Sequence, residues 1–259
     1  MNILRITSKE NQIIKDVKKL NNSSKYRYEK KSFVIEGLRL IEDAADNSIQ
    51  FLHLLFTEEF EQKHSSFIKK FLSNSKEAYM VSQQLLSSIS DTKTPQGVLA
   101  VAKMPENSKK INFDGKYIAL ENLQDPSNLG AVARTAEALG IDGIFISSDS
   151  CDIYSPKVLR SSMGTTLRMP IFVCDNLLSE LKANNFKTFA CVVHGDSENL
   201  GTFSFEKGSV AVIGNEGNGL SKEMIENCDK RIIIPMNGRV ESLNAAVAAS
   251  IVMWEMVRE

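Results

Sequence analysis

The chain has 259 residues, of which 42% are hydrophobic and 24% charged, with 31 basic residues against 32 acidic ones. This apolar content can build one large domain or two modest ones, and the even charge gives no whole-chain sign of a polyanionic partner. No apolar run approaches membrane-spanning length, and no signal-type apolar block follows the N-terminal lysines. We therefore expect a soluble cytoplasmic protein that does not contact a membrane.

The basic residues are unevenly distributed. Residues 1–31 contain nine bases and three acids, a local net charge of +6 (9 minus 3). Such a segment could meet RNA phosphates by releasing counterions, although a solvated surface helix fits the same pattern.

Cysteines and histidines are scattered. The four cysteines form no CxxC pair, and the three histidines lie far apart. We expect free thiols in a reducing compartment and no metal site.

The first part of the chain alternates short apolar runs with helical patterns, which predicts an α/β domain. The expected strands cover 33–35, 51–56, 79–81 and 98–102, and the expected helices cover 9–20, 37–45, 58–72 and 82–88. The segment 104–110, MPENSKK, has proline, charge and no periodicity. We place the boundary there, between domains 1–105 and 106–259.

A second alternating series follows the boundary. Strands are expected at 117–120, 143–146, 170–173, 188–193, 210–213 and 232–234, and helices at 129–139, 156–162, 177–183 and 221–227. The strands are apolar almost throughout, which favours a largely parallel sheet covered on both faces.

The last helix is rich in small residues and is expected to begin near Ser242, whose hydroxyl could cap it. Val247, Ile251 and Trp254 form a stripe at spacings of four and three, which alone indicates a packed core helix. The polar turn before the helix follows a strand, and α/β proteins bind ligands at the carboxyl ends of strands.

Two further loops are polar. ENLQDPSNLG, residues 121–130, leads into a helix on which Arg134 points away from the apolar stripe. GNEGNGLS, residues 214–221, contains three glycines but neither a P-loop ending nor GxGxxG. Glu216 suits a cationic group or a hydroxyl better than a phosphate.

Together, ENLQDPSNLGAVARTAEALG, VIGNEGNGLS and IPMNGRVESLNAAVAASIVMWE resemble the three motifs of the SpoU, or TrmH, branch of the SPOUT RNA methyltransferases, in the family's order. FVIEGLRLIEDA and TPQGVLAVA resemble the substrate-binding domain often found ahead of it, with the fold of certain RNA-binding ribosomal proteins. The resemblance implies methyl transfer from S-adenosylmethionine to a ribose 2′-hydroxyl in structured RNA, ribosomal RNA rather than transfer RNA. It also implies a trefoil-knotted α/β catalytic domain and a homodimer that completes each site.

The resemblance also assigns residues. Gly214, Ile234 and Leu243 match positions whose backbone holds the cofactor. The polar positions grouped at the active site are matched by Asn128, Arg134, Glu216, Ser242 and Asn244. Where members often have Val-Ser after the last asparagine, this chain has Ala245-Ala246, so packing there is expected to differ.

A ribose hydroxyl must lose its proton to attack, and a sulfonium donor needs no metal. A guanidinium is almost never neutral, so we expect Arg134 to grip a phosphate and stabilise the alkoxide rather than act as the base. Two alternatives remain open from the sequence: a non-catalytic RNA-binding or ribosome-assembly protein on this fold, and a nucleotide-binding transferase that uses the 214–219 loop.

Overall fold

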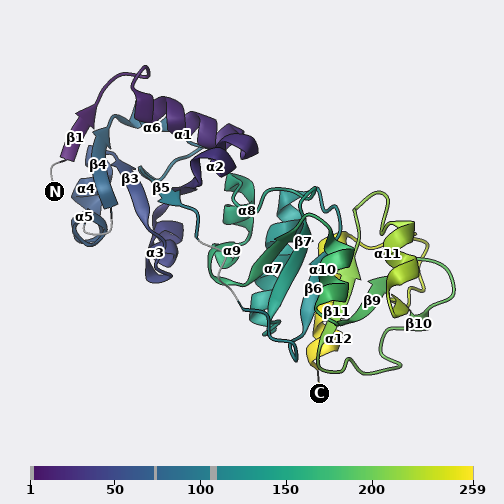
Figure 1. Cartoon of the computed structure of the whole chain (residues 1–259). Helices are drawn as coiled ribbons and strands as arrows, with labels where there is room; N and C mark the ends of the chain where they lie inside the picture. The colour runs from purple at the N-terminus through teal and green to yellow at the C-terminus, as the bar shows by residue number, and fades with distance from the viewer. Residues whose placement is uncertain (1–2, 73–74, 106–109, 259) are drawn as a thin grey trace. The chain divides into compact units, whose positions relative to one another are not determined.

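The computed structural model describes residues 3–72, 75–105 and 110–258. Contacts divide the chain into two units, residues 1–106 with 154–168, and residues 107–153 with 169–259 (Figure 1). Of the expected linker 104–110, residues 106–109 lie outside the described part. The predicted domains 1–105 and 106–259 place residues 154–168 in the second domain, whereas the contacts place them in the first unit. Whether 1–105 and 106–259 are independent domains stays a prediction.

The first unit contains a five-stranded mixed sheet in the order β1-β4-β3-β5-β2. The strands are β1 (Ile3–Ile6), β2 (Ser32–Glu36), β3 (Phe51–Phe56), β4 (Ser75–Val81) and β5 (Val98–Lys103). Strands β1, β4 and β3 are parallel, while β5 runs antiparallel to both β3 and β2. The expected strands are confirmed, and β1 is additional: Leu4 is exposed, so its sequence carries little alternation.

The helices of this unit pack their apolar positions on the sheet. They are α1 (Gln12–Asn22), α2 (Ser24–Lys30), α3 (Leu38–Asp46), α4 (Glu58–Lys63), α5 (Ser65–Leu72) and α6 (Gln83–Ser87). The single helix expected over 58–72 is two helices, because α4 ends at His64.

The basic N-terminal segment is only partly a surface. Arg27 is 4% exposed, and its guanidinium donates to the carbonyl oxygens of Leu20 and Asn21 at the end of α1. Lys15 pairs with Glu10 at 2.6 Å. Arg27 thus satisfies helix-end carbonyls, and the cations available on the surface are fewer than the sequence count.

The segment 154–168, which comes after β7 in the chain, belongs to the first unit and contains α8 (Pro156–Ser161) and α9 (Thr165–Arg168). The Tyr154 ring lies 4.9 Å from that of Phe33 on β2. Arg168 pairs with Asp43 at 2.5 Å. This segment therefore adds to the core of a unit whose other residues lie more than 45 positions earlier.

The second unit contains a seven-stranded sheet in the order β10-β12-β9-β11-β6-β7-β8, with every pair parallel. The strands are β6 (Tyr117–Leu120), β7 (Gly143–Ser147), β8 (Ile171–Cys174), β9 (Lys187–Cys191), β10 (Glu198–Asn199), β11 (Ser209–Ile213) and β12 (Lys230–Ile233). The predicted parallel α/β fold is confirmed.

Helices cover both faces of this sheet. Helices α10 (Leu177–Ala183) and α11 (Lys222–Asn227) lie over one face, while α7 (Pro126–Ala138) and α12 (Ala245–Val257) pack together on the other (Figure 1). Tyr117 and Ala119 belong to the core beneath α10 and α11. This two-sided cover explains why the strands read as apolar throughout.

The C-terminal segment takes a long path. Strand β12 lies beyond β9, yet α12 contacts β11 and α7 on the other side of β9. The chain after β12 therefore crosses the carboxyl ends of β9 and β11, as expected for a knotted domain of this class.

Two expectations for the last helix are wrong. Its cap is Asn244, not Ser242, because Asn244 Oδ1 accepts from the Ala246 and Val247 N–H groups and Ser242 lies outside the helix. The stripe of Val247, Ile251 and Trp254 is not core: these side chains are 47%, 37% and 58% exposed. The buried face is made of small residues and methionines instead, since small side chains let α12 approach α7 closely.

Candidate active site

The site lies where the order of strands reverses. Strand β6 is flanked by β7 on one side and by β11 on the other, so the loops after β6 and β11 diverge from neighbouring strand ends. Such a switch point leaves a crevice at the carboxyl edge of a parallel sheet. Residues 121–128 and 214–221 occupy it.

A relay of side chains joins these loops to the last helix. Asn244 Nδ2 donates to Asn128 Oδ1 at 3.0 Å, and Asn128 Nδ2 donates to Glu216 Oε1 at 2.9 Å. Asn128 is 7% exposed. Since the capping oxygen of Asn244 also fixes the first turn of α12, one network sets the positions of all three sequence motifs.

Glu216 is fully engaged within the protein. Besides Asn128, the N–H groups of Asp125 and Gln124 donate to its carboxylate, at 2.9 and 3.1 Å. Burial alone would raise the pKa of Glu216, but these hydrogen bonds outweigh it and hold the pKa below its ordinary value. Three donors and a lowered pKa suit a structural anion better than a proton acceptor.

Further hydrogen bonds hold the same two loops together. The Glu121 carboxylate accepts from both the N–H and the hydroxyl of Ser221, at 2.8 and 2.7 Å. Asn215 Nδ2 donates to the carbonyl of Asn122 at 2.8 Å. The loops are therefore built as a single rigid wall.

Gly214 permits the tight fold of the second loop. A Cβ atom there would lie 2.2 Å from the Gly219 carbonyl carbon. The loop closes through hydrogen bonds between the backbones of Asn215 and Gly219, at 3.0 and 2.9 Å. Any side chain at position 214 would push these strands of the loop apart.

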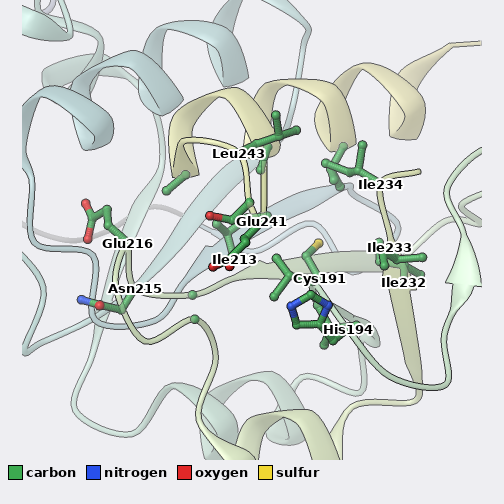
Figure 2. A pocket seen from close by; sticks show the side chains of 18 of the residues that line it. Cys191, His194, Ile213, Asn215, Glu216, Ile232, Ile233, Ile234, Glu241 and Leu243 are labelled. Carbon is green, nitrogen blue, oxygen red and sulfur yellow. The ribbon is translucent and has the colours of Figure 1, made fainter. Parts of the chain in front are cut away.

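Beside this wall lies a cavity of about 280 Å³, close to the lower end of small-molecule sites, roughly 300–1,000 Å³. In Figure 2, Asn215 and Glu216 lie at one end and Ile232 to Ile234 at the other, with Leu243 facing Cys191 and His194 across it. Its walls combine apolar side chains with the backbone and polar side chains of the loops that follow β9, β11 and β12.

Five of the predicted site residues line this cavity: Gly214, Glu216, Ile234, Ser242 and Leu243. Asn128 and Asn244 support it from behind through the relay. Arg134 does not line it. This side chain is exposed on α7, and it has no hydrogen-bond or ion-pair partner in the described part of one chain.

Sequence reasoning missed the opposite wall, which comprises Cys191, Val192, Val193, His194 and Leu200. Cys191 ends β9, residues 192–194 follow it, and Leu200 comes directly after β10, so a position at or just after the end of a strand was the available signal. Burial raises the pKa of Cys191 well above its ordinary value, which keeps the thiol protonated.

No group of three or more His, Cys, Asp or Glu side chains among the described residues could hold a metal ion. Within the described ranges, no helix is long and apolar enough to span a bilayer.

A parallel α/β unit whose cavity is closed by a C-terminal segment crossing the strand ends defines a SPOUT-class methyltransferase. Residues 115–254 match the SpoU rRNA Methylase family, and residues 11–100 match the MRM3-like substrate binding domain. The chain belongs to the SpoU rRNA methylase family, and is a methyltransferase.

Relatives cover the whole chain. It is 33% identical to the 23S rRNA (guanosine(2553)-2′-O)-methyltransferase RlmP of Bacillus subtilis, over 97% of this chain and 98% of that protein. It is 32% identical to an uncharacterized tRNA/rRNA methyltransferase of Synechocystis, over 99% and 94%.

Solved structures agree. The AdoMet-bound rRNA methyltransferase from Sinorhizobium meliloti has a TM-score of 0.86 and 28% identity, covering 98% of this chain and 97% of that one. The SpoU methyltransferase AviRb from Streptomyces viridochromogenes, in complex with AdoMet, has a TM-score of 0.86 and 26% identity, covering 96% and 97%.

Proposed function

We propose that this enzyme transfers a methyl group from S-adenosylmethionine to a ribose 2′-hydroxyl in ribosomal RNA. The observation that carries the proposal is the relay from Asn244 through Asn128 to Glu216, which fixes the three motif segments around the cavity. The identity to RlmP over nearly the full chain supports ribosomal RNA over transfer RNA. We expect the enzyme to act in the cytoplasm, where bacteria make that RNA.

The cavity fits the cofactor in its donor chemistry. Its rim offers backbone groups of the 214–219 loop and of Ile234 and Leu243, while apolar side chains supply a dry wall. We assign Gly214, Ile234 and Leu243 to binding of the adenosyl moiety. When bound, S-adenosylmethionine supplies an electrophilic methyl group on a sulfonium, and no metal is needed for that chemistry.

The protein positions the ribose and stabilises charge. Arg134 carries a guanidinium on the surface of α7 that has no partner among the described residues of its chain, suited to grip a phosphate next to the target and to stabilise the alkoxide as its proton leaves. Asn128 and Asn244 fix the positions of the first turns of α7 and α12, which we expect to face the RNA. Glu216 anchors the 121–128 loop, and Ser242 lies at the cavity rim within reach of a polar ligand group.

The enzyme acts as a homodimer through α12. Its exposed stripe of Val247, Ile251 and Trp254 is apolar, and the helix has apolar residues on every side, which favours burial all round. Arg134 lies on the neighbouring α7 and outside the cavity of its own chain. A second copy docked on α12 would bring its Arg134 toward the cavity of the first copy. In a single chain Arg134 does not line the cavity.

The test is transfer of tritiated methyl from S-adenosylmethionine to unmodified ribosomal RNA, by wild type and by Arg134→Ala, with mapping of alkali-resistant positions. Label at one resistant ribose, lost in the variant, is the expected result. Cofactor binding without incorporation into any RNA, including assembling particles, would favour a non-catalytic RNA-binding protein.

A further inference from the structure

A groove of about 560 Å³ lies within the first unit, apart from the methyltransferase cavity. Its walls are the end of β2 with the start of α3, the 92–96 loop, and α8 with Met163. The lining of the groove includes Arg39, Leu40, Thr92, Gln96, Arg160 and Met163.

Hydrogen bonds between its walls make the groove preformed. Gln96 Oε1 accepts from the Leu38 N–H at 3.0 Å, and Gly37, at φ +96°, leaves room for that approach. Across the groove floor, the Glu36 carboxylate accepts from the Asp91 N–H at 3.0 Å and from the Thr92 hydroxyl. The walls therefore do not depend on a ligand to be brought together.

The charged groups of the groove leave donors without acceptors. Arg160 pairs through Nη2 with Asp91 at 2.5 Å, whereas its Nη1 is buried and has no hydrogen-bond partner. Arg39 is exposed and, within the described ranges, makes no hydrogen bond or ion pair. Both nearby carboxylates, Glu36 and Asp91, are already engaged. The exposed guanidinium of Arg39 can therefore meet an anion at the groove, whereas the buried Nη1 of Arg160 is out of a ligand's reach.

The rest of the surface is apolar. Leu38, Leu40 and Leu159 line the groove, and Met163 is 52% exposed beside them. An apolar floor next to the exposed Arg39 guanidinium matches an unpaired nucleotide, whose base has an apolar face and whose phosphate is an anion. A paired duplex keeps its base faces stacked and would not use the floor.

We propose that this groove binds an unpaired nucleotide of the RNA substrate, with its base against Leu40 and Met163 and its phosphate on Arg39. The proposal rests on the proposed function, because it names a second contact with the same RNA. It is supported by the match of residues 11–100, which include Arg39 and Gln96, to a substrate binding domain.

The test compares Arg39→Gln with Lys69→Gln in the full chain. Lys69 is exposed on α5 outside the groove, so both variants lose one surface charge. With transcribed 23S rRNA, Arg39→Gln should raise KM about tenfold and lower the salt slope of binding by about one, leaving kcat and cofactor affinity unchanged. Lys69→Gln should match wild type.

Base contact is tested separately by placing the photocrosslinker p-benzoylphenylalanine at Met163, with the same replacement at Lys69 as control. Crosslinking to a labelled 12-nucleotide oligouridine, but not to a 12-base-pair duplex, is expected from Met163 alone. Equal crosslinking at both positions, or to the duplex, would overturn the base contact.

The two proposals fail in different ways. If wild type methylates ribosomal RNA and Arg39→Gln has an unchanged KM, the groove is wrong and the function stands. If wild type methylates no RNA but oligouridine binding still depends on Arg39, the function is wrong and the groove stands. Binding of peptides to the groove with no effect of Arg39→Gln on RNA would assign it to a protein partner instead.

Discussion

Asn128 and Asn244, 116 positions apart in the chain, share a hydrogen bond of 3.0 Å that ties the start of α7 to the start of α12. One amide of this pair also holds Glu216, and the other caps α12. The pair therefore couples the stability of the last helix to the geometry of the cavity wall.

Asn244→Ala should cost about 1 kcal/mol of unfolding free energy through the lost cap, and should also lower kcat at least about tenfold because the relay is broken. Urea unfolding and methyl transfer measure the two effects. Asn176→Ala is the matched control, since Asn176 caps α10 by accepting from the Ser179 N–H at 2.8 Å. It should lose similar stability with full activity. Equal activity in both variants would remove the relay from the mechanism.

Arg134→Ala should leave the unfolding free energy within about 0.5 kcal/mol of wild type, because the side chain is exposed. Its kcat should fall roughly 100-fold or more, as for other preorganised stabilisers of charge. Arg134→Lys should remain well below wild type, because an ammonium lacks the planar fork. Nearly full turnover of the lysine variant would rule out a role for the fork.

Trp254 is the only tryptophan of the chain and is 58% exposed in the single chain, so its emission can report on the proposed dimer. Its emission should be blue-shifted at micromolar concentration and shift red on dilution. Ile251→Asp should elute as a monomer with red-shifted emission and little activity. Val173→Asp, at an equally exposed apolar site on β8, should stay dimeric. A concentration-independent, red-shifted emission in wild type would argue for a monomer.

Mixing variants tests whether each site uses two chains. Arg134→Ala and Leu243→Asp, each inactive alone, should recover about a quarter of wild-type activity when unfolded and refolded together, since half the dimers are mixed and carry one intact site. Sites contained in single chains would recover nothing on mixing.

Glu216 should contribute to acid sensitivity. Its folded pKa lies below the ordinary value of 4.5, so its stabilisation is present above that pH and is lost as pH falls through the folded pKa. The difference in unfolding free energy between wild type and Glu216→Gln should be constant from about pH 5 to 8 and shrink below about 4.5. A difference that does not change down to acid unfolding would contradict the lowered pKa.

The basic α1 face makes a separate prediction. Neutralising Lys15, Lys18 and Lys19 to glutamine should weaken RNA binding and flatten its salt dependence. Neutralising Arg27 would instead destabilise the first unit, because its guanidinium is buried against helix-end carbonyls. Filter binding across salt concentrations distinguishes the two, and unchanged binding of the triple variant would remove α1 from the RNA surface.

Local pattern predicted most strands, because each is a continuous apolar run between polar loops. It failed on α12, where Val247, Ile251 and Trp254 look like core but are exposed on the single chain. A sequence shows which face of a helix is apolar, not whether a neighbour within the chain or another molecule covers it. Likewise, Ser242 and Asn244 are both residue types that cap helices well. The sequence does not show that Asn244 is held in place by its hydrogen bond to Asn128.

The residues that line the cavity could be predicted only in part, because some lie in recognisable loops and others depend on the order of the strands. Gly214, Ile234 and Leu243 follow strands within motif-like loops, whereas Cys191 and His194 have only their place at the end of an apolar run to mark them. Their place depends on β9 and β12 being neighbours, which is a property of the strand order. Residues 154–168 follow the predicted boundary in the sequence, yet Tyr154 and Arg168 contact Phe33 and Asp43, and no local pattern indicates these long-range contacts.

The contribution of residues 154–168 to the first unit bears on how the chain is made. Tyr154 and Arg168 are synthesised 51 and 65 residues after the end of β5 (154 minus 103 and 168 minus 103), so the contacts with Phe33 and Asp43 form only after that stretch has left the ribosome. During that interval β6 and β7 are already synthesised. A ribosome stalled before residue 154 would therefore carry two incomplete units. The first unit would lack residues 154–168, and the second would lack β8 to β12.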